Sequence, residues 1–193
     1  MRVEILNYVD HWQEVKNAAM NTVGKEDGKY PDSKWKRRML LAEHSPVRLV
    51  ELTIRMHDLP YWISVHLVRH HVGVEHFVST QRSDRTGVNR ATLPQNALVC
   101  HTMHLNAQAM IYISRKRLCR QAAKETRQAW LQVVEAVRQV EPELASVCVP
   151  ECVYRGFCPE LKPCGYARSV EFIGPYQRYI DSDRDVSTET GTA

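Results

Sequence analysis

The sequence predicts an α+β fold, in which a long central helix and flanking helices pack on a β-sheet. Two patterns carry this prediction. In Val47–Met56 apolar and polar side chains alternate, which is the pattern of a half-buried strand. In His104–Val140 apolar side chains recur at helical spacing, and this long helix is expected to end at Glu141, because Pro142 follows it.

The N-terminal part of the chain predicts one strand and two helices. Met1–Val9 is expected to be a strand. Asp10 has the side chain of an N-cap for a helix over His11–Val23, and Gly24 supplies the stop. A second helix is predicted over Asp32–Glu43.

Between the predicted strand and the long helix, shorter elements alternate with loop. Asp58 as a cap and Pro60 in the first turn predict the start of a short helix over Tyr61–Val68. Glu75–Arg82 is interpreted as a strand or extended chain, and Ser83–Asn89 as a loop, because it contains Asp, Gly and Asn.

Composition is that of an ordinary globular protein. With 193 residues, of which 44% are hydrophobic, the chain is long enough to bury a sizeable core. We expect a single catalytic domain over residues 1–181, which includes a Cys-rich segment at 148–164. Residues 182–193 are polar and are expected to form a disordered tail.

Charge and hydropathy restrict the partners. The net charge of +4 is a mild excess, which suits local sites for small anions and predicts no nucleic acid polymer as a partner. The N-terminus MRVEILNYVDHW carries charges where a signal peptide needs an apolar run. No stretch approaches the ~18 apolar residues of a membrane span. We therefore expect a cytoplasmic protein with no membrane partner.

The densest group of chemically active side chains follows the predicted short helix. It runs from Arg69-His70-His71 through Glu75-His76 to Ser79 and Arg82. Arg offers a bidentate fork for phosphate or carbonyl oxygens, and His donates to an oxygen in either tautomer. One His alone would be explained by a solvated loop, but this run favours a binding site.

Two further sets of residues are ambiguous on spacing alone. Asn106 and Arg117 share one face of the predicted long helix, roughly 16 Å apart at ~1.5 Å per residue, and would suit the two ends of an elongated ligand. The simpler alternative is that Asn106 caps the helix and Arg117 extends from the edge of the core. Arg90, before Leu93-Pro94, is a weak signal when taken alone.

Together, these segments resemble the flavin-dependent thymidylate synthases, which make thymidylate without the usual Cys nucleophile. That family carries Arg-His-Arg, seven residues and then Ser. Arg69-His70-His71, the next seven residues and Ser79 reproduce this spacing. The family also carries an Arg four residues before the Pro of a Leu-Pro pair, as Arg90 and Pro94 do here.

The resemblance extends over residues 40 to 135. The long helix of the family has an Arg eleven residues after an Asn and a Glu eight residues further, and Asn106, Arg117 and Glu125 match all three. Upstream, Ser45-Pro46 resembles the Ser/Thr-Pro element of the family. Several positions depart from the family pattern: Glu43, His71, His76, Gln81, Gln108 and Tyr112.

The resemblance implies a mixed sheet and a homotetramer whose active sites are built from several subunits. It implies that five residues hold FAD: Ser45, Arg69, His70, His71 and Asn106. It implies that four residues hold the nucleotide dUMP: Ser79, Arg82, Arg90 and Arg117. Of these, Ser79 and Arg117 are the candidate catalytic residues, and Ser79 would orient the nucleotide.

The implied reaction is reductive methylation of dUMP at C5 to dTMP, with methylenetetrahydrofolate as carbon donor and NADPH as reductant. The flavin carries the redox chemistry, and the protein supplies orientation and electrostatics. Two alternatives stay open. One is an enzyme of the same fold that acts on another pyrimidine nucleotide, and the other is a non-catalytic nucleotide-binding or metal-stabilised protein.

A cluster of cysteines lies near the C-terminus. Cys148, Cys152, Cys158 and Cys164 fall within 17 residues that also contain several Pro and Gly. In a reducing compartment such a cluster suggests a tetrathiolate site for zinc, or an iron–sulfur cluster. We interpret such a site as structural and separate from catalysis. The alternative is a set of reduced, buried thiols that pack the C-terminal segment.

Overall fold

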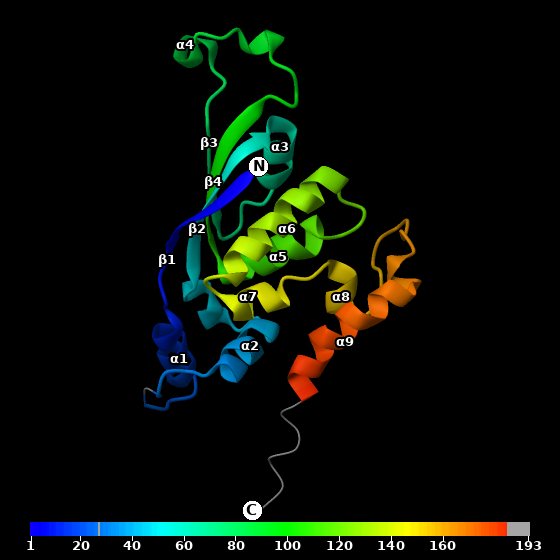
Figure 1. The fold of residues 1–193 in the computed structure, drawn as a ribbon. Coiled ribbons are helices and arrows are strands. Elements are labelled where there is room, and N and C mark those ends of the chain that lie inside the picture. The colour runs from blue at the N-terminus through cyan, green and yellow to red at the C-terminus, as the bar shows by residue number, and fades with distance from the viewer. Residues whose placement is uncertain (27, 185–193) are drawn as a thin grey trace, which may run out of the picture.

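A four-stranded sheet organises the chain in the computed structural model, which describes residues 1–26 and 28–184 (Figure 1). The strands are β1 (Arg2–Tyr8), β2 (Glu51–Pro60), β3 (Val74–Val78) and β4 (Leu98–Asn106). Their spatial order is β1-β2-β4-β3, and every neighbouring pair is antiparallel. The α+β class is therefore confirmed, but the mixed sheet is wrong. β2 and β3 run in the same direction, but β4 separates them, so no parallel ladder forms between these two strands.

Alternation of side chains buries one face of this sheet. In β4, Val99, His101, Met103 and Leu105 are buried, while the residues between them are more exposed. This is the period of two that a half-buried strand requires. β4 was not predicted, because residues 104–106 were assigned to the long helix. β2 confirms the predicted strand over residues 51–56 and continues it to Pro60.

The first helices confirm the sequence predictions with small changes of boundary. They are α1 (Trp12–Asn21) and α2 (Ser33–Leu41). Asp32 is the N-cap of α2, and its side chain accepts a hydrogen bond from the backbone N of Trp35 at 2.7 Å. The side chain of Asp10 accepts from the backbone N of Trp12 at 3.1 Å, although the N-cap position of α1 itself is His11.

The segment around β2 differs in two details from the prediction. The 3-10 helix η1 (Ser45–Leu49) occupies residues that were expected to begin the strand. The short helix α3 (Tyr61–Leu67) is confirmed, but Asp58 does not cap it. Asp58 lies within β2 at φ +53°, where the register between β2 and β4 shifts, so it belongs to a bulge of the sheet.

The single long helix predicted over His104–Val140 is wrong. Two helices replace it: α5 (Ala107–Arg117) and α6 (Lys124–Arg138). The turn between them is held by distant residues. The side chain of Gln121 donates to the carbonyl of Lys162, and the guanidinium of Arg120 lies 3.9 Å from the ring centroid of Tyr166. These contacts cross about 40 residues of sequence, so helical periodicity cannot reveal them.

The rest of the described chain is loop and short helix, apart from α9. α4 (Ser83–Thr86) and the 3-10 helix η2 (Arg90–Thr92) lie between β3 and β4. α7 (Pro142–Val147), α8 (Glu151–Arg155), the 3-10 helix η3 (Tyr166–Arg168) and α9 (Val170–Arg184) follow α6. The predicted tail began at residue 182, but residues 182–184 belong to α9, and residues 185–193 lie outside the described residues. No helix in the described part of the chain is long and apolar enough to cross a membrane.

Candidate functional site

A pocket of about 730 Å³ opens between η1, the loop after α3 and the first half of α5. This volume falls in the range of ~300–1,000 Å³ that is typical of small-molecule and cofactor sites. Its basic and amide side chains are Arg48, Arg69, His70, His71, Asn106 and Gln108. Its apolar and aromatic side chains are Val72, Ala109, Tyr112 and Ile113. The pocket therefore combines donors for anionic or carbonyl oxygens with a surface for flat rings.

The start of α5 is built into the pocket wall. Asn106 is the N-cap, and its Oδ1 accepts a hydrogen bond from the backbone N of Ala109 at 2.9 Å. The backbone N of Asn106 donates to the carbonyl of Gly73 at 3.1 Å. Gly73 has φ +70°, and a Cβ built on it would lie 2.7 Å from Nδ2 of Asn106. Only glycine fits this approach, which places the loop 69–73 against the positive end of the helix dipole.

The structure brings together four of the five residues predicted to hold a flavin. Arg69, His70, His71 and Asn106 all line the pocket. Ser45 does not line it, but it begins η1, whose Arg48 does. Arg48 was missed by sequence reasoning, since its only marker was the preceding Ser45-Pro46 element.

Two contacts of the pocket wall involve residues that depart from the family pattern. The side chain of Gln108 accepts a hydrogen bond from Nε of Arg48. Glu43, at φ +48°, pairs with Arg115, whose side chain is only 9% exposed. The Arg115 guanidinium also lies 3.4 Å from the ring centroid of Tyr154. The carboxylate in the pocket wall is thus already neutralised and does not repel an anionic ligand.

Arg117 lies behind the pocket in contact with His70. Its Nε donates to Nε2 of His70 at 2.8 Å, and its Nη2 donates to the carbonyl of His66 at 2.7 Å. Burial lowers the pKa of His70 to about 4, and the positive charge of Arg117 acts in the same direction. His70 is therefore neutral near pH 7, and Arg117 has two of its three nitrogens engaged within the chain.

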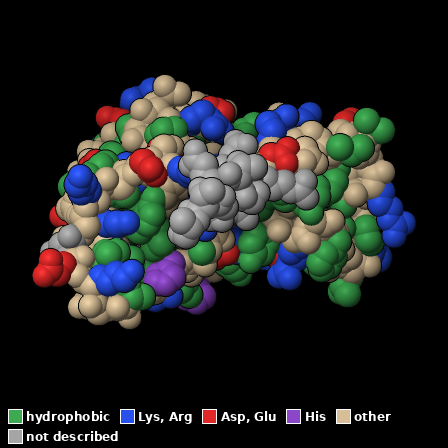
Figure 2. All heavy atoms as spheres, turned by 90° about the horizontal axis from the view of Figure 1, so that it is seen from below, with side chains coloured by type: hydrophobic (Ala, Val, Ile, Leu, Met, Phe, Trp, Pro, Cys, Tyr) green, Lys and Arg blue, Asp and Glu red, His purple; other side chains and the backbone are tan. Residues whose placement is uncertain are grey.

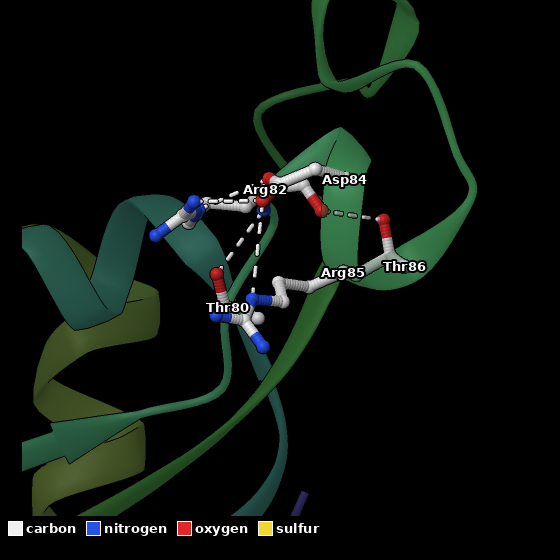
Figure 3. Close-up of polar contacts among 5 residues, drawn as sticks. All are labelled: Thr80, Arg82, Asp84, Arg85 and Thr86. Atoms are coloured by element: carbon white, nitrogen blue, oxygen red, sulfur yellow. Dashed lines mark hydrogen bonds and ion pairs between the residues drawn. The ribbon is translucent and has the colours of Figure 1, made fainter.

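The other predicted nucleotide ligands lie on a protruding arm, residues 79–97, between β3 and β4. Figure 1 shows this arm beyond the end of the sheet, on the opposite side from α7 and α9. The arm carries Ser79, Arg82 and Arg90, and none of them lines the pocket. Figure 3 shows Arg82 reaching Asp84 on α4, with its Nη2 2.7 Å from Oδ2 and its Nε 3.0 Å from Oδ1. Both side chains are more than half exposed.

Ser79 belongs to the base of this arm. Its backbone N donates to the carbonyl of Cys100 at 2.8 Å, and its Oγ accepts from the backbone N of Cys100 at 2.9 Å. In this chain the Ser79 hydroxyl thus helps to close the junction between β3 and β4. The O–H of Ser79 can still donate to a ligand, because the bond to Cys100 uses only a lone pair of Oγ.

The predicted four-cysteine metal site is not formed. Among residues 1–26 and 28–184, no group of three or more His, Cys, Asp or Glu side chains is arranged to hold a metal ion. Cys148 belongs to the main core, whereas Cys152 packs in a separate cluster with Val153 and Phe172. Burial raises the pKa of Cys148 to about 12, which favours the neutral thiol. Different packing partners therefore separate Cys148 from Cys152, whereas Cys158 packs against the same cluster as Cys152.

The surface carries no broad field of one sign on the face seen from below. Figure 2 shows Lys and Arg side chains interspersed with Asp, Glu and apolar side chains there. This distribution agrees with the mild net charge of +4.

Solved structures of similar fold can be compared with this geometry. Two crystal structures of the flavin-dependent thymidylate synthase ThyX from Helicobacter pylori, both with FAD and dUMP, align at TM-scores of 0.61 and 0.62. They are 12% identical to this chain, and the alignments cover 77% of this chain and 99–100% of theirs. The chain has the fold of the flavin-dependent thymidylate synthases. The resemblance predicted from the motifs is confirmed at the level of the fold.

A third structure of this fold is a UMP/dUMP methylase, PolB from Streptomyces cacaoi, bound with 5-Br dUMP. It aligns at a TM-score of 0.61 with 15% identity, over 76% of this chain and 93% of that one. By sequence alone, no protein-family model and no curated protein matches this chain. The fold is therefore indicated by the motif spacing and by the solved structures, which are 12–15% identical to this chain.

Proposed function

We propose that this protein is a flavin-dependent enzyme that methylates dUMP at C5 to form dTMP, with methylenetetrahydrofolate as carbon donor and NADPH as reductant. One observation carries the proposal. Arg69, His70 and His71 meet the capped N-terminus of α5 in one pocket, in a fold whose solved structures hold FAD with dUMP, or 5-Br dUMP.

The pocket fits a flavin nucleotide by its donor set. Arg48, Arg69 and the start of α5 suit a pyrophosphate, because guanidinium groups and a helix N-terminus both favour anions. Tyr112 and Ile113 supply a surface for an aromatic ring system. When bound, FAD supplies the redox chemistry, and the residues of the chain orient it and exclude water.

The nucleotide is assigned to Ser79, Arg82, Arg90 and Arg117. Guanidinium groups match both a phosphate and the carbonyl edge of uracil. Nη1 of Arg117 can donate to the nucleotide, since Nε and Nη2 already donate to His70 and to the carbonyl of His66. Ser79 has its hydroxyl proton to offer, because its Oγ already accepts from Cys100.

We further propose a homotetramer in which the arm of one chain completes the pocket of another. The arm residues Ser79, Arg82 and Arg90 do not line the pocket of their own chain, and all three are exposed. Two large apolar side chains at the base of the arm, Phe77 and Leu98, are each 62% exposed and would be covered by another subunit in this arrangement. The exposed edge strand β3 lies at the same end of the sheet.

The decisive experiment is a reconstituted assay. The purified protein is incubated with FAD, methylenetetrahydrofolate, NADPH and dUMP, and the nucleotide product is identified by mass. We expect NADPH oxidation that depends on dUMP, and a product heavier by one CH2 unit, because a methyl group replaces the hydrogen at C5. Arg90→Ala should raise the KM for dUMP by roughly 10- to 100-fold, the loss of one charge-assisted contact. Arg85→Ala, on the same exposed arm, is the matched control and should leave the KM nearly unchanged.

A second candidate substrate is UMP, because one solved structure of this fold is a UMP/dUMP methylase. The same assay with UMP in place of dUMP separates the two, since the ratio of kcat/KM values identifies the preferred nucleotide. If the protein binds no FAD even when FAD is added, the enzyme proposal fails. A non-catalytic nucleotide-binding protein is then the remaining interpretation.

A further inference from the structure

Three histidines and one arginine form a continuous chain of hydrogen bonds behind the pocket. Arg117 donates from Nε to Nε2 of His70 at 2.8 Å. A guanidinium has no acceptor, so Nε2 of His70 must carry a lone pair. The proton of a neutral His70 then lies on Nδ1. The arginine thus selects one of the two tautomers of the imidazole.

A second hydrogen bond ties the backbone of His70 to His76 on strand β3. Nε2 of His76 lies 2.6 Å from the carbonyl oxygen of His70, which only accepts, so Nε2 of His76 carries a proton. Nδ1 of a neutral His76 is then an acceptor and lies 2.9 Å from Nε2 of His101, which must donate. His101 is fully buried on the core face of β4. The chain of bonds therefore runs from a rigid strand to the pocket loop.

The remaining nitrogen of His101 agrees with this assignment. Its Nδ1 is buried and has no hydrogen-bond partner among the described residues. In the tautomer deduced above it carries only a lone pair, whereas the other tautomer would bury an unpaired N–H beside it and leave His76 without a donor. Arg117 thus sets the tautomer of His70, and the bonds of a neutral His76 set the tautomers of His76 and His101.

We propose that His70 is a neutral hydrogen-bond donor whose Nδ1–H is presented to a carbonyl oxygen or an unprotonated ring nitrogen of the ligand, and that Arg117 is the positioning residue that sets this tautomer. The assignment of the ligand as a flavin rests on the proposed function. Nδ1 is the ring nitrogen left for a ligand, because His70 lines the pocket while its Nε2 is engaged by Arg117.

Such a donor selects the class of group that it binds. A neutral N–H is suited to the acceptor edge of a heteroaromatic ring. A phosphate is bound more strongly by the charged guanidinium groups of Arg48 and Arg69. The ring of Tyr112 meets His70 edge-on, with centroids 5.9 Å apart. His70 and Tyr112 therefore define the part of the pocket that receives a ring, and the arginines define the part that receives the anion.

The surroundings keep His70 neutral. Burial is the largest cause of its lowered pKa, followed by the positive charge of Arg117 and then by His76, His71 and Lys116. No carboxylate among the described residues counts among the main causes of this shift or opposes it. The Nδ1–H donor is thus retained throughout the physiological pH range.

The first test needs no substitution in the site. Nitrogen NMR of the ligand-free protein labelled with ¹⁵N-histidine should show His70 as the neutral Nδ1–H form from about pH 5 to about pH 8, across the ordinary range of histidine titration. The His70 signals are assigned by their loss in His70→Asn. A neutral Nε2–H form, or a charged His70 near pH 7, would overturn the proposal. This result stands whether or not the protein binds a flavin.

The second test compares two replacements of His70 by their FAD dissociation constants. Asn places an amide near the position of Nδ1, and Gln places one near that of Nε2. We expect His70→Asn to bind FAD within about threefold of the wild type and His70→Gln to bind about tenfold more weakly, the loss of one hydrogen bond. Equal losses in both variants would show that the donor position is irrelevant. Wild-type protein that binds no FAD would refute the flavin assignment. The tautomer of His70 would then be tested by the NMR experiment alone.

Discussion

The carbonyl of Gly73 accepts a hydrogen bond from the backbone N of Asn106 at 3.1 Å, and a Cβ on Gly73 would lie 2.7 Å from the Asn106 side chain. The pocket loop and the start of α5 therefore touch at a point where only a hydrogen atom fits. Since Asn106 also caps α5, the contact links the geometry of the loop to the stability of the helix.

Gly73→Ala should damage both stability and ligand binding. We expect a loss of roughly 2–3 kcal/mol, from the left-handed backbone and the displaced cap together. Gly87→Ala is the matched control, because Gly87 has φ +71° but no atom within 4 Å of the point that its Cβ would occupy. It should lose only about 1–2 kcal/mol and leave FAD binding unchanged. Urea unfolding and FAD titration measure the two effects, and equal behaviour of the two variants would contradict this view of the contact.

The Glu43–Arg115 pair should matter far more than an exposed pair. Glu43→Gln leaves the guanidinium of Arg115, 9% exposed, without its carboxylate, and should cost about 3 kcal/mol of unfolding free energy. Asp84→Asn removes the partner of Arg82 on the arm, where both side chains are more than half exposed, and should cost less than about 1 kcal/mol. Similar losses in chemical denaturation would show that burial does not decide the strength of these pairs.

Stability should fall as the solution is acidified, in part because of His101. Burial lowers the pKa of His101 to about 4, below the ordinary value of 6.5. The unfolded chain therefore takes up a proton as the pH falls through about 6.5, while the folded chain does so only near pH 4. The contribution is present above about pH 6.5 and is lost toward pH 4, and a shift of this size corresponds to about 3 kcal/mol.

The variant His101→Gln isolates this effect from the titration of carboxylates. Gln keeps an amide N–H for Nδ1 of His76 but does not titrate. Unfolding free energies measured near pH 7 and near pH 4.5 should therefore differ less in this variant than in the wild type. An unchanged difference would mean that His101 is not the group responsible.

Mixed oligomers test whether the arm of one chain completes the pocket of another. Arg69→Ala impairs the pocket and Arg90→Ala impairs the arm, so each chain alone should have little activity at a dUMP concentration well below the raised KM of Arg90→Ala. Co-expressed in one cell, the two impaired chains should recover part of the activity at that concentration, since some sites combine an intact pocket with an intact arm. Arg69→Ala with His70→Ala is the control that should recover nothing, because both residues line the pocket of the same chain. A fully active monomer by light scattering would exclude the tetramer.

Local sequence patterns were sufficient for several elements. Alternation predicted most of β2, and local signals predicted α1, α2 and α3, although Asp10 is not the N-cap of α1 and Asp58 does not cap α3. Asp32 caps α2 as its side chain predicts, because such a cap needs only neighbouring backbone groups. Motif spacing, through the resemblance, also identified Arg69, His70, His71 and Asn106, which meet in one pocket.

Other features depend on contacts between residues far apart in the sequence. The break between α5 and α6 is held by Lys162 and Tyr166, and Cys148 is separated from Cys152 because the two enter different clusters. β4 is the exception, since its alternation was present in the sequence but lost to a longer helical pattern. Residue spacing along the chain brought Arg117 and His70 into one candidate site, but only the tertiary structure decided that they bond to each other. The physical reason is that a cap or an amphipathic period is satisfied within a few residues, whereas a buried hydrogen bond is satisfied by whichever segment the fold brings alongside.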